Sequence, residues 1–176
     1  MPYSFRITKS KLNVNQYLQF LTAYTPYYTR DVGDIRYVGY WGKVRTKDDG
    51  TYEFFPRQGA GHYGARITWE MAARYVNWLQ NDKRSDSPAC FEQGVYDTST
   101  FYRDANGVYH HQTDPSPGAK FWIPNLDEWI KAVYYDPKIE KYWTRPNSTD
   151  RNLIAGLPTL PTPMTETIGH TLWETD

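Results

Sequence analysis

KFWIPNLDEWIKAVYY, residues 120–135, combines a short apolar run, a proline and a capped helix. The apolar run ends at Pro124, because proline has no amide hydrogen to donate to a sheet. Asn125 can cap the helix that follows, and Glu128, three residues on, completes a capping box. We expect the helix to end at Tyr135, because the Asp-Pro pair that follows cannot continue it.

Two further helices are predicted upstream. Asn13 caps the first with Gln16 as its capping-box partner, and one face carries an apolar stripe of Tyr17, Phe20, Leu21 and Tyr24. Thr68 caps the second, whose stripe is Met71, Ala72, Tyr75, Trp78 and Leu79. Three polar residues fall largely off that stripe, namely Glu70, Arg74 and Asn77.

The strands are expected to be short. Residues 3–8 alternate loosely and predict a first strand. Asp-Gly in the segment 47–50 predicts a hairpin of 42–46 with 51–55, and the segment 104–107 predicts a second hairpin of 100–103 with 108–111. We expect an irregular loop over 27–42, and little regular structure after Tyr135 until the last residues.

These elements indicate an α+β fold with two to three helices packed on short antiparallel strands and much irregular loop. Residues 1–150 are expected to form a single domain, and 151–176 a proline-rich C-terminal tail. We expect the tail to lie along the surface or to dock on a neighbouring molecule.

Composition narrows the classes of partner. Lys plus Arg and Asp plus Glu both number 20, so no positive field favours nucleic acid, and we expect no nucleic-acid partner. Cys90 is the sole cysteine, which excludes an internal disulfide and fits a reducing compartment. Residues 1–8 lack the pattern of a signal peptide, and no apolar run approaches the roughly 20 residues that span a bilayer. We therefore expect a protein made in the cytoplasm, without membrane insertion.

Aromatic content is the outlier, at 16 Tyr, 7 Trp and 7 Phe. Rings with polar groups supply rigid contact area in binding loops. The alternative is that half or more of them pack beneath those loops as small satellite cores. The candidate binding residues are Tyr37, Tyr40, Trp41, His62, Tyr63, Tyr102, Tyr109 and His110.

Catalytic and metal-ligating patterns are weak. His110 and His111 are adjacent on a predicted strand, so their side chains point to opposite faces and cannot share one ion. The Asp104 loop lacks the carboxylates of a calcium loop, and a hairpin turn explains it better. Cys90 would need a base that sequence cannot place. We expect no metal, no cofactor and no enzymatic activity.

Three segments carry a resemblance to a known family: VNQYLQFL (14–21), ITWEMAARYVNWL (67–79) and FWIPNLDEW (121–129). In this order they resemble the formylglycine-generating-enzyme-like, or sulfatase-modifying-factor, domain, over about residues 10–145. The resemblance implies a variant of the C-type lectin fold. The element at 94–96, the extra Trp122 and the KAVYYDP ending are most similar to bacterial and phage members without assigned chemistry.

The departures from that family bear on function. Its catalytic members bind copper with a pair of cysteines near the C-terminus and oxidise a substrate cysteine, whereas this chain has only Cys90. Residues 169–174 resemble the family's Gly-Asn-Val-Trp-Glu-Trp element, but the core strand that follows it in the family is missing. We expect another stretch of this chain, or a neighbouring molecule, to complete the core.

The hypothesis that follows is a non-enzymatic binding or structural module. The resemblance to phage members suggests a virion component, such as a decoration, cement, tail or adhesion protein, that forms an oligomer and contacts capsid or tail proteins. One alternative is an oxidase of the formylglycine-generating type, with copper held by Cys90 and a histidine. Another is a receptor domain that binds a surface glycan through Trp41 or Tyr63.

Overall fold

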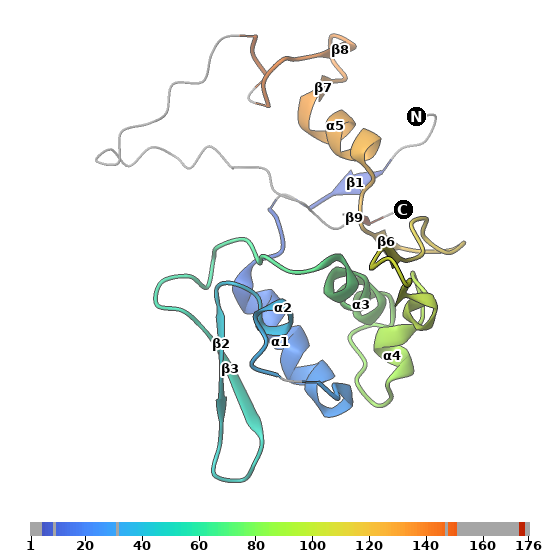
Figure 1. The fold of residues 1–176 in the computed structure, drawn as a ribbon. Coiled ribbons are helices and arrows are strands. Elements are labelled where there is room, and N and C mark those ends of the chain that lie inside the picture. Colours follow the sequence, from blue (N-terminus) through green and yellow to red (C-terminus); the bar gives the residue numbers. More distant parts are fainter. Residues whose placement is uncertain (1–4, 9, 31, 147, 151–172, 175–176) are drawn as a thin grey trace.

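The computed structural model describes residues 5–8, 10–30, 32–146, 148–150 and 173–174 (Figure 1). These residues form helices and short antiparallel strand pairs, which confirms the α+β class. The α-helices are α1 (Val14–Tyr24), α2 (Ile35–Val38), α3 (Trp69–Gln80), α4 (Ala89–Glu92) and α5 (Leu126–Tyr134). Two 3-10 turns span Thr25–Tyr27 and Thr98–Thr100.

The strands fall into one three-stranded sheet and three hairpins. In the sheet, β9 (Trp173–Glu174) lies between β1 (Arg6–Ile7) and β6 (Phe121–Trp122), antiparallel to both. The hairpins pair β2 (Gly42–Thr46) with β3 (Tyr52–Pro56), β4 (Tyr102–Arg103) with β5 (Tyr109–His110), and β7 (Tyr135–Asp136) with β8 (Lys141–Tyr142). Figure 1 shows the three-stranded sheet between α5 and α3, and the β2–β3 hairpin projecting from the body next to α1.

The helix starts follow the local capping chemistry. Asn13 Oδ1 accepts from the Gln16 amide at 2.9 Å, and Gln16 Oε1 accepts from the Asn13 amide at 3.0 Å. Asn125 and Glu128 form the same reciprocal pair at 2.9 and 2.8 Å. Thr68 Oγ1 accepts from the Met71 amide at 3.3 Å. All three predicted caps are confirmed, although α5 ends one residue earlier than predicted, at Tyr134.

Helix α3 is buried on two faces and separates two apolar clusters. Its Met71, Tyr75 and Trp78 join the first cluster, with α1, α2 and α4. Its Ala73 and Val76 join the second, which includes Val95, Tyr96, Trp122 and apolar side chains from β1 and β6. Asn77, which falls off the predicted stripe, is nevertheless fully buried, because α3 packs on both of these clusters.

The Asn77 side chain ties α3 to the loop after Gly94. Its Oδ1 accepts from the amides of Val95 and Tyr96, both at 2.9 Å. Its Nδ2 donates to the carbonyls of Phe91 at 2.9 Å and Tyr96 at 2.7 Å. A buried amide with both ends satisfied fixes this loop on the helix.

Several predicted loops contain regular structure. The segment 27–42 includes α2, and Cys90 lies on α4 rather than in a loop. The β7–β8 hairpin occupies residues for which little regular structure was predicted. Of the first predicted strand, residues 6–7 form β1, while residues 3–4 lie outside the described ones. Residue 100 belongs to a 3-10 turn instead of a strand. Each correction concerns an element of two to four residues, which is too short for a periodic pattern.

Completion of the small sheet comes from the end of the chain. Strand β9, which lies within residues 169–174, is the central strand of this sheet. That another stretch or a neighbouring molecule replaces the core strand expected after it stays a prediction. The predicted docking of the tail lies mostly outside the described residues, because 151–172 and 175–176 are not among them. Within the described residues, no helix is long and apolar enough to cross a bilayer.

Candidate recognition surface

Three of the predicted binding residues form one aromatic cluster. The ring centroids of Tyr40 and Trp41 lie 4.7 Å apart, and those of Trp41 and Tyr63 lie 5.2 Å apart, both edge to face. The Arg57 and Arg66 guanidinium groups lie 5.9 and 5.4 Å from the Tyr40 centroid. These five residues are called the tyrosine–tryptophan patch below. Tyr40 is 45% and Tyr63 53% exposed, so their rings are available for contact.

Neither His62 nor Tyr37 belongs to the tyrosine–tryptophan patch. His62 is exposed and precedes Tyr63 in the loop. Tyr37 is only 1% exposed, on α2, and its ring stacks on Tyr28 with centroids 3.8 Å apart. Its hydroxyl bonds to Thr25 Oγ1 at 2.7 Å. The prediction of Tyr37 as a surface binding residue is wrong, because α2 turns the ring into the first apolar cluster.

The β4–β5 hairpin brings the other predicted residues together. Tyr102 and His110 stack almost parallel, with centroids 4.8 Å apart and an interplanar angle of 10°. His110 Nε2 lies 3.2 Å from Asp104 Oδ2 in the hairpin turn. Tyr109 faces the opposite side, with its ring 6.2 Å from Phe101. Each face of the hairpin therefore presents aromatic surface.

A cleft of about 430 Å³ opens beside this hairpin. That volume lies within the range of about 300–1,000 Å³ of small-ligand sites. Its walls come from three segments far apart in the sequence, and we call it the aromatic cleft. It is lined by Tyr28, Arg30, Asp34, Thr68, Trp69, Glu70, Met71, Phe101, Tyr102, Arg103 and Tyr109.

The Tyr109 hydroxyl is the least satisfied polar group of the cleft. It is buried, and no hydrogen-bond partner for it exists among the described residues. Burial and the neighbouring Glu70 carboxylate raise the pKa of Tyr109, while Arg74, Arg103 and Arg30 act in the opposite direction. A buried hydroxyl without a partner costs free energy.

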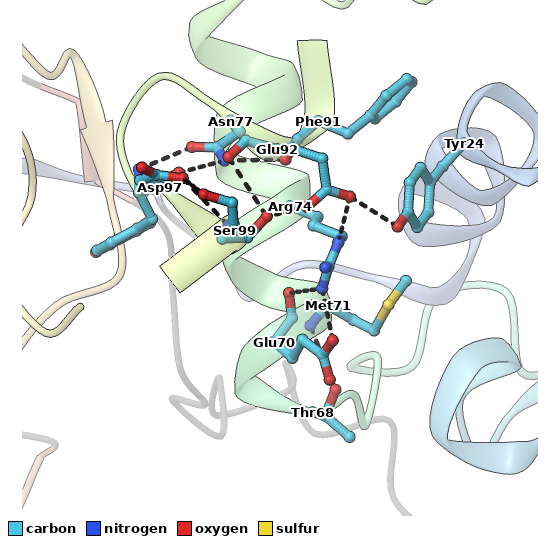
Figure 2. Close-up of polar contacts among 12 residues, drawn as sticks. Tyr24, Thr68, Glu70, Met71, Arg74, Asn77, Phe91, Glu92, Asp97 and Ser99 are labelled. Carbon is cyan, nitrogen blue, oxygen red and sulfur yellow. Dashed lines mark hydrogen bonds and ion pairs between the residues drawn. The ribbon is translucent and has the colours of Figure 1, made fainter. Parts of the chain in front are cut away.

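A network of ion pairs behind the cleft holds Glu70 in place. Figure 2 shows the Arg74 side chain between the carboxylates of Glu70 and Glu92, with the Tyr24 hydroxyl directed at Glu92. Arg74 Nη1 lies 2.9 Å from Glu70 Oε1, and Arg74 Nε lies 2.8 Å from Glu92 Oε1. Tyr24 donates to Glu92 Oε1 at 3.0 Å, and Thr98 donates to Glu92 Oε2.

The balance of forces on Glu92 keeps it ionised. Burial acts to raise its pKa, but the hydrogen bonds from Arg74 and Thr98 outweigh burial and lower the pKa below its ordinary value. The Arg74 side chain is 12% exposed, so the pairs are shielded from water. Glu92 thereby joins α4 to α3 and α1, and the network gives the cleft wall a rigid support.

The patch and the cleft adjoin along one stretch of chain. Arg66 contacts the Tyr40 ring of the patch, and Thr68, two residues on, lines the cleft. Sequence reasoning missed Trp69, Glu70 and Arg30 as lining residues. The i, i+4 spacing of Glu70 and Arg74 is a local signal that could have revealed their ion pair, whereas no local pattern connects residue 30 with the hairpin.

Residues suited to redox or metal chemistry are scattered. Cys90 is 7% exposed on α4, and its thiol donates to Asp86 Oδ1 at 3.1 Å. In the described part of the chain, no three His, Cys, Asp or Glu side chains are grouped closely enough to hold a metal ion. His170 lies outside the described residues.

Comparisons with protein-family models, with curated proteins and with solved structures found no match.

Proposed function

We propose that this protein is a non-catalytic recognition module that binds a partner protein through the aromatic cleft and the adjoining tyrosine–tryptophan patch. The scaffold we propose is a C-type-lectin-like domain of the formylglycine-generating-enzyme-like kind. The proposal extends to a structural or adhesion component of a virus particle, where the partners are capsid or tail proteins and the protein works as an oligomer.

The aromatic cleft is the observation that carries the proposal. Tyr, Trp and Arg are the residue types that dominate binding energy at protein interfaces, and they make up most of the cleft and the patch. Tyr102 remains 56% exposed although it lies beside a cleft, so its ring has contact area to lose on binding. The ion-pair network fixes the wall at Glu70 in advance, which lowers the entropic cost of association.

Sequence resemblance supports the proposed lectin-like scaffold and the proposed role in a virus particle. The three helix and strand segments resemble the family in the same order, and the helices in the first and third of them begin at capping boxes. The single cysteine fits a member without the oxidase chemistry. The proline-rich tail offers a means of attachment to neighbouring subunits.

Fractionation of cells that carry the gene tests the proposal. We expect the wild-type chain to sediment with released particles, and Tyr102→Ala to shift most of the protein to the soluble fraction. Tyr52→Ala is the matched control, because Tyr52 is an exposed tyrosine, at 39%, on the β2–β3 hairpin away from the cleft. A wild-type chain that stays monomeric and soluble in every fraction would exclude the particle role.

A surface glycan is a second candidate partner, favoured by the Tyr102–His110 stack. The two rings lie face to face, so the flat surface on which a sugar ring can lie is the free face of the exposed Tyr102 ring. A glycan array probed with wild type, Tyr102→Ala and Tyr63→Ala tests this candidate. Binding that survives both substitutions would place any glycan site elsewhere.

A further inference from the structure

We propose that the aromatic cleft binds an acidic side chain, aspartate or glutamate, from an apolar segment of a partner protein, with Arg30 and Arg103 facing its carboxylate. This inference rests on the recognition role proposed above and specifies the chemistry of the partner. The reason lies in which charges around the cleft are already compensated.

The negative charges of the lining have partners within the protein. Glu70 Oε1 accepts from Arg74 Nη1 at 2.9 Å. Asp34 is engaged in a contact of its own. Glu92, the second carboxylate of the network, does not line the cleft and accepts from Tyr24 and Thr98. A cationic ligand would therefore have to compete with Arg74 for the Glu70 carboxylate.

The two arginines of the lining, Arg30 and Arg103, form no ion pair with an acidic side chain in the described part of the chain. Arg30 is exposed and makes no hydrogen bond or ion pair with any residue in the described ranges. Arg103 Nη1 donates at 2.9 Å to the carbonyl of Gly107, a neutral acceptor. Its guanidinium lies 5.3 Å from the Tyr109 ring centroid.

These groups are all hydrogen-bond donors. A guanidinium can only donate, and a tyrosine hydroxyl without a partner can donate as well. A carboxylate has acceptor sites for several donors at once, and charge-assisted hydrogen bonds are about twice as strong as neutral ones. A carboxylate in the cleft can therefore accept from both guanidinium groups.

The aromatic walls specify what surrounds the carboxylate. Trp69 and Phe101 line the same cleft, with their ring centroids 5.6 Å apart. A free inorganic anion would leave these rings in water, whereas apolar residues on either side of the acidic residue would cover them. The segment best suited is a glutamate or aspartate between aliphatic residues.

Two capped pentapeptides serve as probes, one with a central glutamate flanked by leucines and one with glutamine in its place. NMR titration of the purified full chain follows the Trp69 indole N–H, which a Trp69→Phe spectrum assigns. We expect the glutamate peptide to shift this signal and the glutamine peptide to bind about tenfold more weakly. Arg30→Gln should weaken the glutamate peptide about tenfold and should barely affect the glutamine peptide.

Arg45→Gln is the control, because it removes the same charge from an exposed hairpin residue outside the cleft. Affinity for the glutamate peptide should also fall as salt increases, since the contact is between exposed charges.

Equal binding of the two peptides would overturn the charge inference while leaving the cleft as a binding site. Equal loss in Arg30→Gln and Arg45→Gln, or no shift at Trp69 with millimolar peptide, would also overturn it. Particle sedimentation tests the recognition role independently of these outcomes.

Discussion

Replacement of Asn77 by alanine should strongly destabilise the protein, because the side chain is buried and hydrogen-bonded at both ends of its amide. The substitution removes four hydrogen bonds and leaves two amides and two carbonyls buried without their partner. At a net contribution of about 1 kcal/mol for each bond, the loss is about 4 kcal/mol. That is a large fraction of the roughly 5–15 kcal/mol by which a domain is stable.

Urea unfolding followed by tryptophan fluorescence measures this loss. With a slope of about 2 kcal/mol/M, Asn77→Ala should lower the midpoint by about 2 M. The control is Asn81→Ala, one turn further along the chain. The Asn81 amide also donates three hydrogen bonds, but it is partly exposed, so water can bond to the carbonyls that Asn81→Ala leaves free. The loss in free energy of unfolding should therefore be about 1 kcal/mol. Equal midpoints for the two variants would refute the argument that burial of the Asn77 contacts decides stability.

The ion-pair network and the capped helix α5 give three more expectations. Arg74→Gln should destabilise by about 2 kcal/mol in urea unfolding, because it leaves two partly buried carboxylates uncompensated, whereas Arg45→Gln at an exposed pair should change little. Because the pKa of Glu92 is lowered below its ordinary value of 4.5, its stabilising effect is present above that pH and is lost as pH falls through the lower, folded value. The difference in unfolding free energy between wild type and Glu92→Gln should therefore shrink below pH 4.5, and a constant difference would contradict the network. Trp122→Phe should cost about 1–2 kcal/mol in thermal unfolding, because the indole no longer donates to the buried Glu128 carboxylate at 3.1 Å.

Helix starts were predictable because their signals are local. A capping residue and its partner three positions on interact within one turn, so Asn13 and Asn125 could be identified without tertiary information. The hairpin turns at Asp-Gly and Asn-Gly are equally local, and both hairpins form. The coarse class followed from these elements.

Residues whose partners are distant were missed. Tyr37 lies in a Tyr- and Gly-rich segment without a period, and its burial depends on Tyr28 and Phe54, which come from other elements. Asn77 lies off the predicted apolar stripe, and its contacts with residues 91–96 make it a core residue. A stripe predicts one buried face, whereas α3 has two.

The aromatic cleft was predictable in part. Tyr102 and Tyr109 were identified because aromatic residues stand beside a hairpin turn. The cleft itself exists only where residues 28–34, 68–71 and 101–109 meet, and no sequence pattern encodes that meeting. Arg30 is an ordinary exposed arginine in the sequence, and its position beside Tyr109 depends on the tertiary fold.

Hydrogen–deuterium exchange of the free and the particle-bound protein tests the central claim most directly. The account predicts added protection in peptides that cover 28–34, 68–71 and 101–109, with a smaller gain around Tyr40 and Tyr63. The β2–β3 hairpin tip should exchange at the same rate in both states. Protection confined to that tip, or an unchanged pattern around the cleft in protein that is bound to particles, would contradict recognition through the aromatic cleft.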